Sequence, residues 1–215
     1  MNQSNQTQLS IALNDLKLIK SINTISSEIN KYINRKPVIM YYETFDMYKK
    51  LVEPTIKKYD RKWVLNILSG IEEHDKIVYQ NDNFILLPDT SWKNDLNNLD
   101  DPNNIEELYL VLIVKRKDIY SIRDLTAEHI PLLEDMLRVT EQIEKIYKIP
   151  ACMLRTYFHY KPSTWHLHLH INNINSPKNY CYNIERCHTL ANVINNIKCD
   201  GNYYKKVDLQ VTKGV

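Results

Sequence analysis

The sequence predicts an α+β fold, in which an antiparallel sheet packs against two main helices. Residues 108–114 (LYLVLIV) form a continuous apolar run that is typical of a buried strand. Residues 126–147 and 183–197 carry apolar side chains at helical spacing. The remaining apolar stretches are short and follow one another through turn residues, which favours hairpins and therefore antiparallel pairing.

The N-terminal part, residues 1–60, is expected to be a short helical segment that precedes the sheet. Its first 10–20 residues are polar and are expected to be disordered. Residues 26–33 predict a helix that ends before Pro37, and residues 44–58 predict a second one that is kinked near Pro54.

Residues 61–215 are expected to form one further domain. Its first part, 63–69, is apolar and ends at Gly70. The strands that we expect besides 108–114 share a period of two or an apolar run bounded by turn residues; they are 75–79, 83–87, 153–160, 165–171 and 205–211.

Composition excludes several classes of protein. The chain has 215 residues with a net charge of +2, and no apolar run is long enough for a transmembrane helix. Its start lacks the pattern of a signal peptide. Its three glycines form neither GxGxxG nor GxxxxGK[ST], which excludes a Rossmann fingerprint and a P-loop. Four cysteines without a CxxC pair predict reduced thiols.

Residues 163–171, STWHLHLHI, place three of the seven histidines at every second position. In a strand, His166, His168 and His170 would all face one side, while Leu167 and Leu169 would face the core. A surface strand with coincidental histidines is one interpretation.

A zinc site is a second interpretation, but histidines four residues apart in a strand lie about 13 Å from each other, so a further ligand such as His159 would be needed. The third interpretation is covalent catalysis on phosphate, because a neutral imidazole is a good nucleophile near pH 7.

The wider sequence resembles the scavenger mRNA-decapping enzymes, the m7GpppX diphosphatases of the histidine triad superfamily. The segment LRTYFHYKPS at 154–163, followed by HLHLHI, carries the resemblance. Further matching segments follow in order between residues 24 and 211; they are WVLNIL at 63–68, LPD at 87–89, LYL at 108–110, SIRDLT at 121–126 and IERCH at 184–188.

The resemblance implies a histidine triad fold, with 1–60 as a hinge and dimerisation segment and 61–215 as the catalytic domain. It implies hydrolysis of the triphosphate bridge of the 5′ cap, to 7-methyl-GMP and a nucleoside diphosphate or oligonucleotide. His168 would be the nucleophile, His166 and His170 its partners, and His159 would assist the leaving group. No metal and no other cofactor is expected.

The resemblance also implies a cap pocket. Trp63 would stack on the cationic methylated base and Glu73 would accept from its edge. The other implied contacts with base, ribose or phosphate are Pro88, Asp89, Tyr109, Ser163, Arg186 and Lys31.

Three departures from the family pattern stand out. Ser91 replaces a lysine, whose contact would be lost or taken by Lys93, and Thr164 replaces an aromatic residue beside the triad. Only 62 residues precede Trp63, where the family has a larger N-terminal domain that closes over the site. A reduced lid would admit longer capped RNA.

Two alternatives within this interpretation remain open: a hydrolase of another dinucleoside polyphosphate, and a non-catalytic cap-binding protein. We expect a homodimer that binds the cap dinucleotide or short capped RNA, with neither membrane nor DNA as a partner. The cytoplasm is the expected compartment, with the nucleus as a second one.

Overall fold

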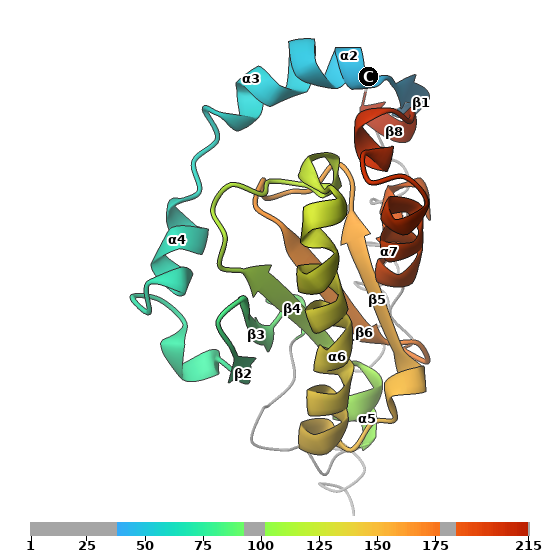
Figure 1. Ribbon diagram of the computed structural model, residues 1–215. Helices are drawn as coiled ribbons and strands as arrows, with labels where there is room; N and C mark the ends of the chain where they lie inside the picture. The colour runs from blue at the N-terminus through green and yellow to red at the C-terminus, as the bar shows by residue number, and fades with distance from the viewer. Residues whose placement is uncertain (1–37, 93–101, 177–183, 215) are drawn as a thin grey trace, which may run out of the picture. The chain divides into compact units, whose positions relative to one another are not determined.

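The computed structural model describes residues 38–92, 102–176 and 184–214 (Figure 1). The chain divides into two compact units, residues 1–39 with 213–215 and residues 40–212. The second unit contains a six-stranded antiparallel sheet and both long helices, which confirms the predicted α+β fold. The helix expected at 26–33 lies outside the described residues, and the domain boundary near residue 60 stays a prediction.

The helical stretch predicted at 44–58 is present, in three pieces after strand β1 (Val38–Glu43). They are α2 (Phe45–Met47), the π-helical turn η1 (Tyr48–Val52) and α3 (Glu53–Ile56). The Thr44 hydroxyl caps the start by accepting from the Met47 N–H at 3.1 Å. Pro54 lies in the first turn of α3, where a missing N–H is tolerated.

Helix α4 (Lys62–Leu68) corresponds to the apolar segment 63–69. It ends in a Schellman motif, since the Gly70 N–H donates to the Ile67 carbonyl at 3.0 Å and the Ile71 N–H to Asn66 at 2.9 Å. Gly70 has a φ of +72°, which only glycine adopts without a steric penalty. This ending turns the chain sharply after the helix.

The strand order of the large sheet is β2-β3-β4-β6-β5-β7. Its strands are β2 (Tyr79–Gln80), β3 (Phe84–Pro88), β4 (Tyr109–Val114), β5 (Leu154–His159), β6 (His168–Asn173) and β7 (Cys187–Thr189). The strand predicted at 75–79 is wrong except at its last residue, because Glu73 takes a left-handed φ of 53° and His74–Lys76 form the 3₁₀ turn η2. Short helical elements η3 (Ile122–Asp124), η4 (Ala127–His129), η5 (Ala151–Met153) and α5 (Pro102–Glu106) connect the rest.

The two faces of the sheet bury different sets of side chains. Helices α6 (Ile130–Tyr147) and α7 (Leu190–Cys199) pack on one face, in a core that includes Leu112, Leu169 and Ile171. Helix α4 packs on the opposite face, against Ile85, Leu87, Val111 and Ile113. Alternation along each strand produces this division.

Two predicted boundaries near the C-terminus are wrong. The helix expected at 183–197 begins only at Leu190, because residues Ile184–Arg186 form the 3₁₀ turn η6 and Cys187–Thr189 pair with β5 as β7. The strand expected at 205–211 is β8 (Leu209–Gly214), which pairs with β1 and follows the 3₁₀ turn η7 (Tyr203–Lys205).

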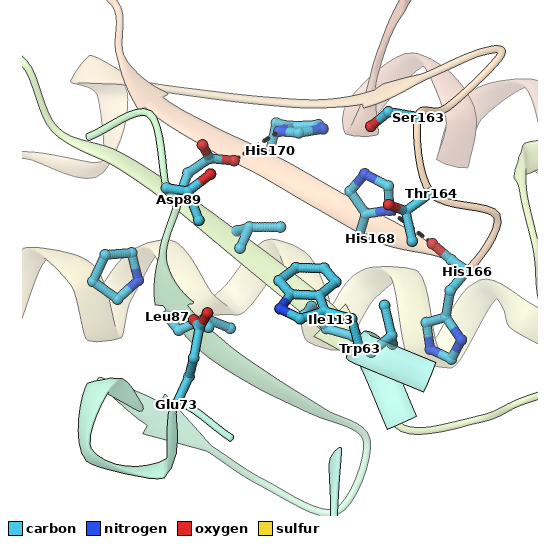
Figure 2. A pocket seen from close by; sticks show the side chains of 14 residues that line it. Trp63, Glu73, Leu87, Asp89, Ile113, Ser163, Thr164, His166, His168 and His170 are labelled. Carbon is cyan, nitrogen blue, oxygen red and sulfur yellow. Dashed lines mark hydrogen bonds and ion pairs between the residues drawn. The ribbon is translucent and has the colours of Figure 1, made fainter. Parts of the chain in front are cut away.

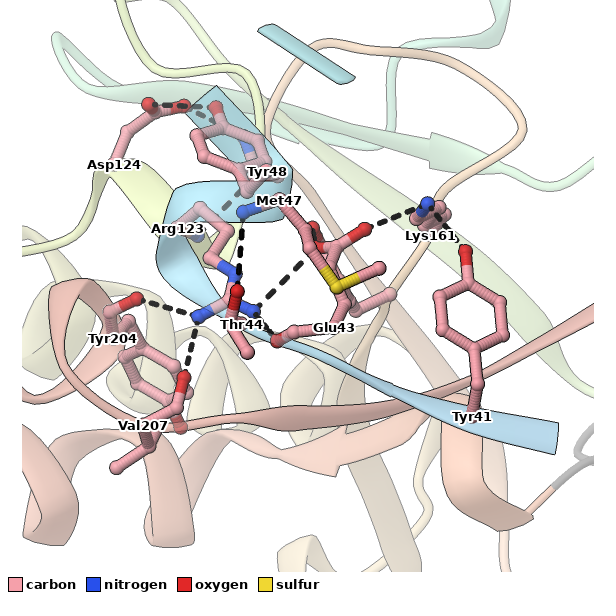
Figure 3. Close-up of polar contacts among 12 residues, drawn as sticks. Tyr41, Glu43, Thr44, Met47, Tyr48, Arg123, Asp124, Lys161, Tyr204 and Val207 are labelled. Carbon is pink, nitrogen blue, oxygen red and sulfur yellow. Dashed lines mark hydrogen bonds and ion pairs between the residues drawn. The ribbon is translucent and has the colours of Figure 1, made fainter. Parts of the chain in front are cut away.

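A buried ionic cluster joins residues that are far apart in the sequence (Figure 3). The Arg123 guanidinium, fully buried, donates to the carbonyls of Glu43 at 2.7 Å, Tyr204 at 2.9 Å and Val207 at 2.8 Å. The Glu43 carboxylate, also buried, lies 3.4 Å from Arg123 and 2.6 Å from the ammonium of Lys161.

In the part of the chain described, no helix has the length and apolar character needed to cross a membrane.

Candidate active site

A pocket of about 190 Å³ opens on the α4 face of the sheet (Figure 2). Strands β3, β4 and β6 form its floor, and the first part of α4 forms one wall. Eight of the predicted site residues line it: Trp63, Glu73, Pro88, Asp89, Ser163, His166, His168 and His170. Residues separated by more than 100 positions in the sequence therefore meet in one cavity.

His168 and His170 face this pocket because they alternate on β6 with core residues. His168 pairs with Ile113 and His170 with Val111 on β4, while Leu169 points into the opposite core as predicted, together with Ile171. The two imidazole centroids are 4.9 Å apart.

His168 is held in a single tautomer. Its Nδ1 lies 2.7 Å from the carbonyl oxygen of His166, and because a carbonyl only accepts, Nδ1 carries the proton. The lone pair of the neutral ring is then on Nε2. Burial lowers the pKa of His168, which keeps the imidazole neutral near pH 7. Both features are those of a nucleophile.

The prediction that all three histidines share a strand is wrong for His166. Strand β6 begins at His168, and His166 lies in the preceding bend. Its Nε2–H donates to the carbonyl of Val114, the last residue of β4, at 2.6 Å. Burial lowers the pKa of His166. The His166 carbonyl, and not its ring, is what touches the His168 ring.

His170 is enclosed by aromatic side chains. Its Nδ1 is 2.7 Å from the hydroxyl of Tyr109, and its ring stacks on Tyr109 and Tyr157 with centroids 5.6 and 5.5 Å away. Burial holds its pKa well below the usual range. Asp89 lies 3.9 Å from Nδ1 of His170. Tyr109 thus supports His170 from behind and does not line the pocket.

His159 lies on β5, beside the histidine row. Its ring centroid is 4.5 Å from that of His170, and burial, helped by the charge of Arg186, lowers its pKa to about 4. Arg186 donates to the Lys161 carbonyl at 2.6 Å and does not line the pocket.

The expectation of four reduced cysteines is wrong. Cys187, whose sulfur lies 3.7 Å from Nδ1 of His159, is disulfide-bonded, whereas Cys152 and Cys199 are free thiols.

Trp63 lies in the first turn of α4 and Glu73 in the turn that follows this helix, and both line the pocket. The Trp63 indole is 43% exposed, so a large aromatic face is available to a ligand. Glu73 is the residue with the left-handed φ of 53°, and such a conformation in a non-glycine residue is often retained at functional sites. The exposure and the backbone conformation both favour a binding role over a core role.

The other predicted residues are placed as follows. Asp89 follows β3; its backbone N–H donates to the Tyr109 carbonyl at 3.0 Å, and its carboxylate accepts from the Ser91 N–H at 2.8 Å. The Ser163 carbonyl accepts from the hydroxyl of Tyr59 at 2.9 Å. Lys31 lies outside the described residues.

Sequence reasoning missed several residues that line the pocket and one that lies behind it. Thr90 and the apolar floor, which is Val64, Leu87, Val111 and Ile113, were not identified, although the alternation in β3 and β4 carried the signal for the floor. Arg61, whose Nη1 lies 3.3 Å from Nδ1 of His166, had no sequence signal.

The arrangement suits nucleophilic and acid–base chemistry on an anion. Several neutral imidazoles lie beside one with a free, directed lone pair. Within the described residues, no group of three histidine, cysteine or acidic side chains is placed to hold a metal ion.

Known proteins resemble this chain over most of its length. Residues 62–185 match the family model described as scavenger mRNA decapping enzyme C-term binding. The m7GpppX diphosphatase of rat (Rattus norvegicus) is 36% identical over 203 residues, and that of Homo sapiens is 35% identical over 203 residues; each alignment covers 90% of this chain and 57% of the relative.

The chain therefore spans just over half the length of these relatives. A solved structure of Hnt3 in complex with DNA and guanosine is 16% identical, covers 64% of this chain and 77% of its own, and has a TM-score of 0.46, which is too low to support an argument. The family-model match and the identity to the diphosphatases are decisive: the chain belongs to the scavenger mRNA decapping enzyme family.

Proposed function

We propose that this protein hydrolyses the triphosphate bridge of the 5′ cap, m7GpppN or capped short RNA. The products are 7-methyl-GMP and a nucleoside diphosphate or a short oligonucleotide. Family membership supports the proposal, together with a pocket that combines an exposed indole with directed imidazoles. Relatives that carry the name m7GpppX diphosphatase cover nine tenths of this chain.

In the proposed mechanism, Nε2 of His168 attacks the phosphorus next to 7-methylguanosine. The bond from phosphorus to the bridging oxygen breaks, and the nucleoside diphosphate leaves with a proton supplied by a neighbouring group. Water then attacks the phosphohistidine, releases 7-methyl-GMP and restores the imidazole. The observation that carries this mechanism is the Nδ1–H tautomer of His168, because it directs the reacting lone pair.

Neighbouring residues supply the remaining roles. His166 and His170 orient the row and contact the phosphate oxygens, and His159 assists the leaving group. Ser163, Arg186 and Lys31 are proposed as phosphate contacts. Arg186 has its guanidinium engaged with the Lys161 carbonyl, so we expect its effect on the phosphate to be mainly electrostatic.

Recognition of the cap is assigned to the opposite part of the pocket. Trp63 stacks on the methylated guanine, whose positive charge is attracted by an indole face. Glu73 accepts from the guanine edge, a bond that the charge of the base strengthens. Pro88 and Asp89 contact base and ribose. Tyr109 acts through His170, because its hydroxyl forms a hydrogen bond with Nδ1 of that ring.

We further propose a homodimer, located in the cytoplasm and also in the nucleus, with no membrane or DNA partner. The departures at Ser91 and Thr164 bear on the ribose-phosphate contact and on the pocket for the leaving nucleotide. We also propose that the site accepts longer capped RNA. Comparing hydrolysis of the cap dinucleotide with that of capped RNA of tens of nucleotides tests this, and a strict preference for the dinucleotide would contradict it.

One chromatographic assay tests the function. Purified protein is incubated with m7GpppG, with and without EDTA, beside the variant His168→Asn. We expect 7-methyl-GMP from the wild type in EDTA and none from the variant. Binding without turnover would indicate a cap-binding protein, and absence of both would direct the search to other dinucleoside polyphosphates, beginning with diadenosine compounds.

A further inference from the structure

Arg61 makes three contacts that link the pocket wall to the histidine row. Its Nη1 donates to the Lys117 carbonyl at 2.8 Å and to Nδ1 of His166 at 3.3 Å. Its guanidinium carbon lies 4.5 Å from the ring centroid of Tyr120, in cation–π geometry. The side chain is therefore fixed on several sides, although it begins at the exposed end of a short helix.

The contact with His166 reinforces the tautomer that the Val114 carbonyl sets. Nε2–H is committed to the Val114 carbonyl, so Nδ1 is an acceptor, and Arg61 is its donor. A proton on Nδ1 would displace this bond and place two positive charges side by side. The charge of Arg61 accordingly helps burial to lower the pKa of His166. The fixed His166 in turn presents the carbonyl that orients His168.

Arg61 is also the residue that precedes α4, two positions before Trp63. The rest of α4 is held on the sheet by the buried side chains of Val64 and Ile67, while its first residues are exposed. The bond from Arg61 to Lys117 is the polar contact that ties this end of the helix to the loop after β4.

We propose that Arg61 is a positioning residue that couples the Trp63 indole to the histidine row, by donating to Nδ1 of His166 and by holding the start of α4 beside the end of β4. Its catalytic consequence rests on the proposed cap hydrolysis, but its effect on the His166 ring does not. Because Arg61 reaches His166 across 105 residues of sequence, the coupling exists only in the folded chain.

The test compares Arg61→Met and Arg61→Lys with the control Lys62→Met. Lys62 is the exposed neighbour and the first residue of α4, so the control removes the same charge from the same end of the helix. Two readouts are taken on folded protein at several pH values: the ¹⁵N shifts of the His166 imidazole, identified with His166→Gln, and the kcat and KM for m7GpppG.

We expect Arg61→Met to keep the Nε2–H bond to the Val114 carbonyl but to protonate Nδ1 of His166 at a higher pH than the wild type. The substitution removes a hydrogen bond from a charged donor, so kcat/KM should fall roughly 10- to 100-fold, through a lower kcat and a higher KM together. Arg61→Lys should recover part of both effects, and Lys62→Met should match the wild type.

The outcomes separate the two proposals. An unchanged His166 spectrum in Arg61→Met overturns the role of Arg61, even if activity falls, because the loss would then reflect stability alone. A wild type that does not hydrolyse the cap overturns the proposed function, while the His166 spectrum still decides the inference about Arg61.

Discussion

Replacing Arg123 with methionine should destabilise the protein more than replacing any other charged side chain among the described residues, because both partners of its ion pair with Glu43 are buried. Methionine is unbranched and apolar, so it fills most of the same space. It removes all the donors that the guanidinium supplies to three carbonyls and to the Glu43 carboxylate. The acceptors of Glu43 and Tyr204 are then left in a dry environment, and that of Val207 in a partly buried one.

The magnitude follows from these contacts. Each orphaned carbonyl costs about 1 kcal/mol, and breaking a buried ion pair costs roughly 3–5 kcal/mol. Lys161 and the Tyr160 hydroxyl continue to contact Glu43, which favours the lower end of that range. The free energy of unfolding should therefore fall by roughly 5–6 kcal/mol, a large share of the 5–15 kcal/mol that is typical.

Urea denaturation measures this loss. The free energy of unfolding of a protein of this size falls by about 2–3 kcal/mol per molar urea, so the midpoint of the unfolding transition should move down by about 2 M. The control is Arg116→Met, since Arg116 pairs with Asp118 on the surface and should contribute less than about 1 kcal/mol. Should Arg123→Met not fold, Arg123→Lys, which keeps the charge and fewer donors, should give an intermediate loss. Midpoints within about 0.5 M of the Arg116→Met value would refute the reasoning.

Three further predictions concern pH, the base platform and His170. Burial lowers the pKa of His188 to about 4, so the unfolded chain binds a proton near pH 6.5 that the folded chain does not, and stability should fall as the pH drops from 6.5 to 4. In His188→Gln, the free energy of unfolding measured with urea should differ less between pH 7 and pH 5 than in the wild type, because one proton-binding group is lost. An equal difference in both proteins would contradict this role of His188. Trp63→Leu should raise KM for m7GpppG roughly tenfold and lessen discrimination against unmethylated GpppG; equal discrimination by both proteins would remove the stacking role. Tyr109→Phe should lower kcat with little change in KM, because its hydroxyl contacts His170 and not the pocket; a change confined to KM would place Tyr109 in the substrate site instead.

Local pattern predicted much of the sheet. Period two placed Leu169 in the core and His168 and His170 on the other face, and the apolar run at 108–114 is β4. These elements were readable because each side chain's environment depends on its immediate neighbours along the strand.

The failures occur where a distant segment decides the conformation. Cys187–Thr189 extend only because β5 offers a free edge, and His166 leaves the strand to reach the Val114 carbonyl. Glu73 takes its left-handed conformation at the turn that follows α4. No window of neighbouring residues contains these partners.

The sequence by itself determined the α+β class, the histidines of β6 and, through an ordered series of matching segments, the family and eight of the residues that line the pocket. Only the tertiary structure decided the tautomer of His168, the support of His170 by Tyr109 and the contact of Arg61 with His166. The physical reason is that propensity and periodicity act over a few residues, whereas a tautomer is fixed by whichever donor or acceptor the fold brings within 3 Å or so of the ring.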